Sequence, residues 1–87
     1  MESPNGEDLM PYTIITQPNC SACQEVKKEL SLSARTYVEV DITDYKNQYI
    51  KNLMKWSGLD TVPQIWNHEG DYIGGYKELQ EYDEELR

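Results

Sequence analysis

Cys20-Ser21-Ala22-Cys23 contains both cysteines of the chain. An apolar, β-branched run at residues 11–16 comes before this segment and predicts a strand. After it, Cys23, Val26 and Leu30 recur at helical spacing, which predicts a helix from about Cys20 to Leu30 or Leu32. The two cysteines therefore stand at the junction between a strand and a helix.

The position of Cys20 at the start of this helix favours its thiolate form. The first N–H groups of a helix have no partner within it, and the helix dipole is positive there. The thiolate is the species that reacts with disulfides. Cys23 lies on the same helical face with its Cβ about 5–6 Å away, and a disulfide needs about 3.5–4.5 Å. A modest adjustment at the helix start lets the pair close and reopen.

Two structural roles for the cysteine pair compete with a redox role. A disulfide that closes a four-residue loop contributes only roughly 2 kcal/mol, against about 3 kcal/mol for a fifteen-residue loop. A structural zinc ion needs four ligands, and the sequence offers His68 as its one histidine and no second C-x-x-C segment. The disulfide would add little stability, and the zinc site would lack ligands. The pattern therefore favours a redox dithiol.

The composition predicts one small domain with few classes of partner. The chain has 87 residues and a net charge of −8, which argues against nucleic acid and anionic membranes as partners. We expect a lead-in segment at 1–10 that is flexible and a single domain at 11–87. Residues 1–9 are acidic and polar, unlike a secretory signal. A monomer in the cytoplasm is expected.

The rest of the chain predicts alternating strands and helices. Residues 36–42 alternate, with Val38, Val40 and Ile42 on one side, and predict a second strand. Helical spacing of apolar residues predicts a second helix at 45–56, and a third at 76–85. Further strands are predicted at 64–66 and 71–73. The order β-α-β-α-β-β-α implies a four-stranded mixed sheet flanked by helices, opened by a right-handed parallel crossover.

Three motifs together resemble the glutaredoxins of the thioredoxin-like superfamily. They are Cys20-Ser21-Ala22-Cys23, the segment from Ser57-Gly58 to Thr61-Val62-Pro63-Gln64, and the segment 72–79, Tyr-Ile-Gly-Gly-Tyr-Lys-Glu-Leu. The resemblance covers nearly all of 11–82 and fits a compact dithiol glutaredoxin, a type that includes viral ones. It implies Cys20 as the nucleophile and Cys23 as the resolving cysteine.

The resemblance also implies a glutathione site, and no bound metal is expected unless the iron–sulfur alternative given below holds. A cis peptide before Pro63 would let the Val62 backbone pair with the cysteinyl part of glutathione. Gly75 and Tyr76 would begin a helix whose N–H groups suit the γ-glutamyl carboxylate, with Glu78 near the glutathione amino group. The full set of implied glutathione-binding residues is Gln17, Thr61, Val62, Pro63, Gly75, Tyr76, Lys77 and Glu78.

Several positions depart from the family pattern. Ser21-Ala22 replaces the usual Pro-Tyr between the cysteines, and Gln17 replaces a frequent lysine. Lys77 stands where Asp or Ser is common. For the basic residue that the second helix often directs at the glycine carboxylate, Lys46 and Lys51 lie near the right place. Without the lysine at Gln17, we expect a Cys20 thiol less acidic than in lysine-bearing relatives, unless Lys27 or Lys77 approaches it.

The resulting hypothesis is a glutathione-dependent thiol-disulfide oxidoreductase, with glutathione as reductant. Its substrates would be disulfide-bearing or glutathionylated proteins, with ribonucleotide reductase as a family-based candidate. One alternative is a thioredoxin-like reductant recharged by a flavoprotein reductase, although Asn19 replaces the tryptophan of thioredoxins. The other is an iron–sulfur module held by Cys20 of two chains and two glutathione thiols, which the small Ser21 would permit. Trp56 and Trp66 are expected to be partly buried in the core, and the alternative for them is a docking face for a partner.

Overall fold

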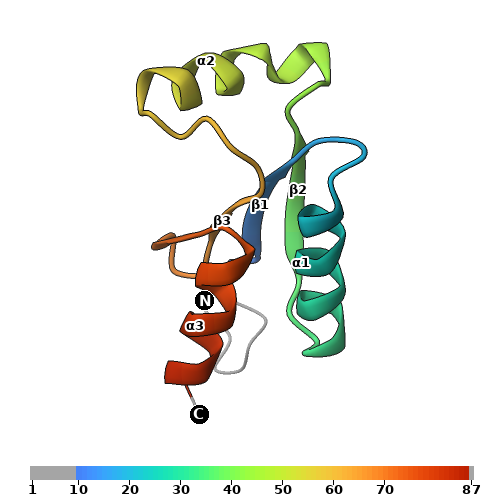
Figure 1. Cartoon of the computed structure of the whole chain (residues 1–87), viewed down its shortest axis with the longest axis vertical. Coiled ribbons are helices and arrows are strands. Elements are labelled where there is room, and N and C mark those ends of the chain that lie inside the picture. The colour runs from blue at the N-terminus through green and yellow to red at the C-terminus, as the bar shows by residue number, and fades with distance from the viewer. Residues whose placement is uncertain (1–9, 87) are drawn as a thin grey trace, which may run out of the picture.

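The computed structural model describes residues 10–86, so the predicted lead-in lies almost wholly outside the described residues. Figure 1 shows the arrangement of the elements. In chain order they are β1 (Tyr12–Thr16), α1 (Ser21–Leu32), β2 (Tyr37–Asp41), the 3-10 turn η2 (Tyr45–Asn47), α2 (Gln48–Trp56), β3 (Gln64–Trp66), β4 (Tyr72–Gly74) and α3 (Tyr76–Glu85). The predicted order of strands and helices is confirmed.

The four strands form one mixed sheet in the order β2-β1-β3-β4. β1 pairs with β2 in parallel, with Ile14 opposite Glu39, and it pairs with β3 antiparallel, with Ile14 opposite Ile65. β3 and β4 form an antiparallel hairpin. The sheet order places β1 at the centre, so the loop that leaves its carboxyl end starts from a fixed position. This loop carries the chain to Cys20.

Two apolar clusters hold the helices to the sheet. The larger joins the strands to α1 and α3 through buried side chains, namely Tyr12, Ile14, Val26, Leu30, Ile65 and Leu79. The smaller is built from Ile15, Ile42 and Met54 and fixes α2. In Figure 1, α1 and α3 run alongside the strands, whereas α2 lies across the top of the view, beyond the ends of the strands. Within residues 10–86, no helix has both the length and the hydrophobicity needed to cross a membrane.

The apolar spacing of residues 45–56 predicts the helix correctly but not which of its side chains are buried. Met54 is buried and Ile50 packs on the smaller cluster, whereas Tyr49 and Leu53 are exposed. Trp66 is partly buried as expected, but Trp56 is 91% exposed, so that expectation is wrong. The helix contains two apolar rows, and only the row with Ile50 and Met54 meets the sheet.

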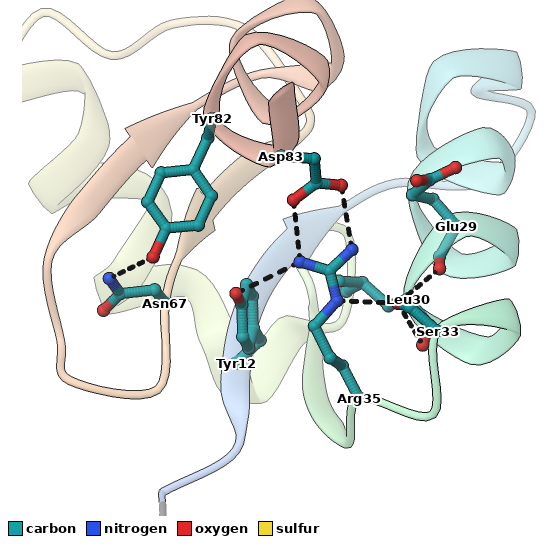
Figure 2. Close-up of polar contacts among 8 residues, drawn as sticks. All are labelled: Tyr12, Glu29, Leu30, Ser33, Arg35, Asn67, Tyr82 and Asp83. Carbon is teal, nitrogen blue, oxygen red and sulfur yellow. Dashed lines mark hydrogen bonds and ion pairs between the residues drawn. The ribbon is translucent and has the colours of Figure 1, made fainter. Parts of the chain in front are cut away.

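A polar network ties α3 to the end of α1 (Figure 2). Arg35, just before β2, donates two hydrogen bonds to the carboxylate of Asp83 on α3, each 2.9 Å long. It also donates to the hydroxyl of Tyr12 at 3.2 Å, and its guanidinium lies 5.1 Å from the centre of that ring. Hydrogen bonding to Asp83 raises the pKa of Arg35, and burial raises the pKa of Tyr12. The network fixes α3, whose first turn lies beside Pro63.

Candidate active site

Cys20 is the N-cap residue of α1. Its backbone is extended (φ −114°, ψ 105°), and its sulfur accepts a hydrogen bond from the N–H of Cys23 at 3.1 Å. Asn19 before it has a positive φ of 61°, a conformation that asparagine tolerates better than most residues. The predicted placement of Cys20 at the helix mouth is confirmed. Both the hydrogen bond and the helix dipole favour a negative sulfur there.

The two cysteines differ in their access to solvent. Their sulfurs lie at bonding distance, with Cα atoms 5.2 Å apart, so the structure shows the oxidised pair. Cys23 is 1% exposed and belongs to the buried face of α1, whereas Cys20 is partly exposed. A substrate can therefore reach Cys20 but not Cys23. This asymmetry is what a nucleophile and a resolving cysteine require.

The segment before β3 lies against the dithiol. The sulfur of Cys20 is 4.0 Å from the carbonyl oxygen of Val62, and the Val62–Pro63 peptide bond is cis, as the resemblance implies. The side chain of Gln64 is buried and donates a hydrogen bond to the Thr61 carbonyl at 2.9 Å. This contact fixes the loop that carries Val62. A ligand sulfur at Cys20 would thus lie beside the Val62 backbone.

A cavity of about 570 Å³ opens next to this segment. Of the implied glutathione-binding residues, Gln17, Thr61 and Val62 line it. Two exposed lysines of α2, Lys51 and Lys55, also line the cavity. The complete lining is Gln17, Ile42, Lys51, Met54, Lys55, Leu59, Asp60, Thr61 and Val62.

The sequence indicated only one of the two lysines that line the cavity. Lys51 was one of two candidates, and the other, Lys46, lies outside the lining and approaches Asp44 at 3.9 Å. Lys55 was missed. Its signal was available, because it lies four residues after Lys51 and therefore on the same helical face.

The first turn of α3 lies outside the lining of the cavity. A Cβ built on Gly75 would stand 3.4 Å from the Pro63 carbonyl oxygen, so this turn borders Pro63. The N–H of Gly75 donates to the carboxylate of Glu78 at 2.9 Å. Tyr76 is partly exposed and Lys77 exposed. Glu78, implied as a ligand of the glutathione amino group, thus serves here as the cap of its own helix.

The lysine nearest in sequence to the dithiol on α1, Lys27, is paired with a carboxylate of β2. Lys27 pairs with Glu39 of β2 at 3.1 Å, and the same carboxylate accepts from the hydroxyl of Thr16 at 2.6 Å. The hydrogen bond from Thr16 and the pairing with Lys27 lower the pKa of Glu39. Lys27 is therefore committed to a structural contact. The lower acidity expected for Cys20 stays a prediction.

The described residues contain no group of three or more His, Cys, Asp or Glu side chains placed to hold a metal ion. The cysteine pair is the chemically reactive group of this region. An accessible sulfur, a buried partner sulfur and an adjacent cavity can together support exchange between thiols and disulfides. An iron–sulfur cluster of the kind considered above would need Cys20 of a second chain and two glutathione thiols as further ligands.

Comparisons with known proteins give a consistent result. The glutaredoxin family model matches residues 12–73. Human mitochondrial glutaredoxin-2 is 35% identical over 65 residues, which are 71% of this chain and 38% of the relative. The mouse protein of that name has the same identity over the same length, 40% of its chain. The chain thus spans about two fifths of the length of these curated relatives.

Comparison with solved structures shows that the chain shares the fold of known glutaredoxins. The buckwheat glutaredoxin–glutathione complex superimposes with a TM-score of 0.74 at 25% identity, covering 86% of this chain and 69% of the other. Glutaredoxin 1 from Francisella tularensis, in complex with cacodylate, gives a TM-score of 0.72 at 28% identity, with 88% and 95% covered. The expected thioredoxin-like fold is confirmed.

Proposed function

The chain belongs to the glutaredoxin family, and from this premise we propose that it is a glutathione-dependent thiol-disulfide oxidoreductase. Its substrates in this proposal are protein disulfides and glutathione mixed disulfides. The observation that carries the proposal is the unequal cysteine pair, in which partly exposed Cys20 caps α1 and Cys23 is buried behind it. Fold alone would not assign the activity, because one fold supports many functions.

With a protein disulfide, both cysteines take part. The Cys20 thiolate attacks one sulfur of the substrate, forms a mixed disulfide, and releases the other sulfur as a thiolate that takes up a proton. Cys23, as a thiolate, then attacks the sulfur of Cys20. This step releases the second substrate thiolate and leaves the Cys20–Cys23 disulfide. One glutathione thiolate opens that disulfide at Cys20, and a second removes the first as oxidised glutathione.

With a glutathione mixed disulfide, Cys20 is sufficient. Its thiolate attacks the glutathione sulfur, and the substrate protein leaves as a thiol after protonation. A second glutathione thiolate then attacks the glutathionyl sulfur on Cys20, which yields oxidised glutathione and restores the Cys20 thiolate. No electron acceptor other than the disulfide is needed, and Cys23 forms no bond in this cycle.

Three features support glutathione as the ligand. In the cavity beside Val62 the charges of Lys51 and Lys55 outweigh that of Asp60, and this positive balance suits the carboxylates of the tripeptide. The buckwheat relative was solved as a glutathione complex. At α3, Tyr76 and Lys77 have first-turn N–H groups that precede the first intrahelical bond, from Leu79 N to the Gly75 carbonyl. We propose these two N–H groups for the γ-glutamyl carboxylate, because Glu78 already takes that of Gly75.

The test is a glutathione-coupled reduction assay on the wild type and two single-cysteine variants. Cys20→Ser should abolish turnover of both substrate classes. Cys23→Ser should retain reduction of a glutathione mixed disulfide and lose reduction of an intramolecular protein disulfide. Equal loss of both activities in Cys23→Ser would contradict the assignment of roles.

The same assay separates the thioredoxin-like alternative. The proposal requires that glutathione, with glutathione reductase and NADPH, recycles the oxidised wild-type protein. Recycling by a flavoprotein thioredoxin reductase, with no rate from glutathione, would favour the alternative instead.

We also propose a protein substrate, a location and an oligomeric state. Ribonucleotide reductase is the proposed protein substrate, and reduction of its active-site disulfide in the presence of glutathione tests this. The proposed location is the cytoplasm, which imaging of a tagged chain in its source cells would test. The proposed state is a monomer, and sedimentation of the oxidised protein would reveal a dimer.

A further inference from the structure

Gln64, the first residue of β3, has a buried polar side chain that takes no part in the proposed cycle. The residue is only 4% exposed. Its Nε2 donates to two acceptors of Thr61, the carbonyl oxygen at 2.9 Å and the hydroxyl oxygen at 3.2 Å. Because a carbonyl can only accept, the amide nitrogen must face Thr61 and the amide oxygen is turned to the other side. The side chain therefore has a single orientation.

The amide oxygen of Gln64 is held by a residue of another strand. The hydroxyl of half-exposed Tyr72, on the edge strand β4, donates a hydrogen bond to this oxygen. Tyr72 pairs with Trp66, which lies two residues after Gln64 and hence on the same face of the sheet. The ring centres of Tyr72 and Trp66 are 5.3 Å apart, so the tyrosine ring is supported beside β3. A chain of hydrogen bonds thus runs from β4 through Gln64 to Thr61.

The Thr61 carbonyl belongs to the same peptide unit as the N–H of Val62. This peptide is trans and planar, so its C=O and its N–H point in opposite directions. Gln64 holds the C=O, and the N–H is thereby turned away from Gln64. Within residues 10–86 the Val62 N–H has no backbone acceptor, which leaves it available to a ligand.

The backbone of Val62 directs this N–H to the side of the dithiol. A residue before a proline favours extended backbone, and an extended residue presents its own N–H and C=O on one side. The C=O of Val62 is on the side of Cys20, because its oxygen lies 4.0 Å from the cysteine sulfur. Both groups of Val62 are therefore placed to pair with the backbone of a cysteinyl residue whose sulfur is bonded to Cys20.

We propose that Gln64 and Tyr72 are positioning residues, which hold the Thr61–Val62 peptide in the orientation that binds the cysteinyl backbone of a glutathionyl substrate. Neither residue touches glutathione or the reacting sulfurs in this proposal, which rests on the proposed function for the identity of the substrate. Loss of their hydrogen bonds should lower recognition of the substrate. It should leave the reactivity of the Cys20 sulfur unchanged.

The test separates recognition from chemistry with two disulfides. Oxidised glutathione has peptide groups beside its sulfurs, whereas 2-hydroxyethyl disulfide has none. In reduced Cys23→Ser, the Cys20 thiolate attacks one sulfur of either disulfide, the sulfur–sulfur bond breaks, and the other sulfur leaves as a thiolate. Intact mass spectrometry after acid quenching follows the gain of one glutathionyl or one hydroxyethylthio group. The time course gives a second-order rate constant for each disulfide.

Two variants in the Cys23→Ser background break the chain of hydrogen bonds. Tyr72→Phe removes one hydroxyl and should lower the rate constant for oxidised glutathione about threefold or more. Gln64→Leu removes the whole contact to Thr61 and should lower it about tenfold or more. The rate constant for 2-hydroxyethyl disulfide should stay at the value of the parent in both. Circular dichroism checks the fold, and Tyr72→Phe alone serves if Gln64→Leu fails to fold.

Tyr82→Phe is the matched control (Figure 2). Its hydroxyl also bonds to the amide of a buried side chain, since Asn67 is 4% exposed and its Nδ2 donates to Tyr82 at 3.0 Å. Neither residue of this pair hydrogen-bonds to the segment 61–63 within the described part of the chain. Tyr82→Phe should therefore keep the parent's rate constants for both disulfides. All three variants keep the net charge, so long-range electrostatics do not differ between them.

Three results would overturn the proposal. They are an equal decrease for both disulfides in Tyr72→Phe, no decrease for oxidised glutathione in folded Tyr72→Phe, and the same selective decrease in Tyr82→Phe. A preference for oxidised glutathione that the parent has and every variant keeps would refute the positioning role alone. A parent whose preference does not exceed that of free N-acetylcysteine would refute glutathione recognition, and with it the proposed function as well.

Discussion

The acidity of the Cys20 thiol depends on few groups. A decrease of two pKa units needs about 2.7 kcal/mol, whereas a helix terminus supplies about 0.3–1 kcal/mol when exposed and up to about 2 kcal/mol when partly buried. The sulfur also accepts a hydrogen bond from the Cys23 N–H. No lysine stands at position 17, and Lys27 is held by Glu39. The local groups therefore stabilise the thiolate, but only in part.

A lysine at position 17 should make Cys20 more acidic. In Gln17→Lys, a positive charge near the sulfur should lower the pKa of the reduced Cys20 thiol by about one unit relative to the wild type. Absorbance of the thiolate during a pH titration measures this, with Gln48→Lys on α2 as the control that should show no change. A wild-type pKa below about 5, in the range of the most acidic C-x-x-C thiols, would contradict the account.

Glu39 should make stability depend on pH in the acid range. The hydrogen bond from Thr16 and the contact with Lys27 hold its pKa below the ordinary 4.5. The contribution of Glu39 to stability is therefore fully present above about pH 4.5, its ordinary value in the unfolded chain. It is lost as the pH falls through the lowered pKa of the folded protein. Because the side chain is 35% exposed, we expect less than about 1 kcal/mol.

Urea unfolding of Glu39→Gln measures this contribution. The variant should be less stable than the wild type at pH 7, and the difference should shrink as the pH falls below 4.5 and through the lowered pKa of Glu39. Glu25→Gln, at an exposed position of α1, is the control and should match the wild type throughout. A Glu39→Gln deficit that did not change as the pH was lowered through the acid range would show that the carboxylate charge is not its source.

At the scale of elements, α3 depends on its own side chain for its first turn. The Glu78 carboxylate accepts the N–H of Gly75, and a negative charge in the first turn also suits the helix dipole. Glu78→Ala should lower the free energy of unfolding by about 0.5–1 kcal/mol. Glu78→Gln, which keeps an acceptor, should lose less. Equal losses in chemical denaturation would show that the cap is electrostatic alone.

Sequence periodicity predicted elements more reliably than their exposed faces. The helix at 45–56 was predicted from apolar spacing, yet only tertiary packing selects the Ile50 and Met54 row for the core and leaves Trp56 in solvent. The cysteine pair was visible because its chemistry and its spacing are local. Lys55 was missed although it lies four residues after Lys51 and so on the same helical face. Only the tertiary structure shows that this face borders a cavity. The capping role of Glu78 depends on a side-chain conformation that spacing does not specify.

At the scale of the whole molecule, one ion pair joins distant parts of the chain. Arg35 and Asp83 are 20% and 15% exposed and lie between the end of α1 and α3. Their contact spans 48 positions in the sequence, so no local pattern could predict it. Through α3 it also fixes the first turn beside Pro63. Packing at one end of the molecule thereby supports the geometry at the other.

Removal of the Asp83 charge should destabilise the fold without removing the chemistry. Asp83→Asn leaves the partly buried Arg35 without its bidentate partner and should cost about 2 kcal/mol in urea unfolding. Glu84→Gln, at an exposed position next to it, should change stability by less than about 0.5 kcal/mol. Folded Asp83→Asn should retain reduction of glutathione mixed disulfides. Unchanged stability would show that the network contributes nothing net.

The central claim is that a Cys20 thiolate captures the substrate sulfur and that Cys23 releases it. Intact mass spectrometry of the reduced proteins, after a brief exposure to oxidised glutathione and acid quenching, tests this most directly. Cys23→Ser should carry one glutathionyl group on Cys20, the wild type should convert to its internal disulfide, and Cys20→Ser should remain unmodified. A glutathionyl group on Cys23 in the Cys20→Ser variant, at a comparable rate, would contradict the claim.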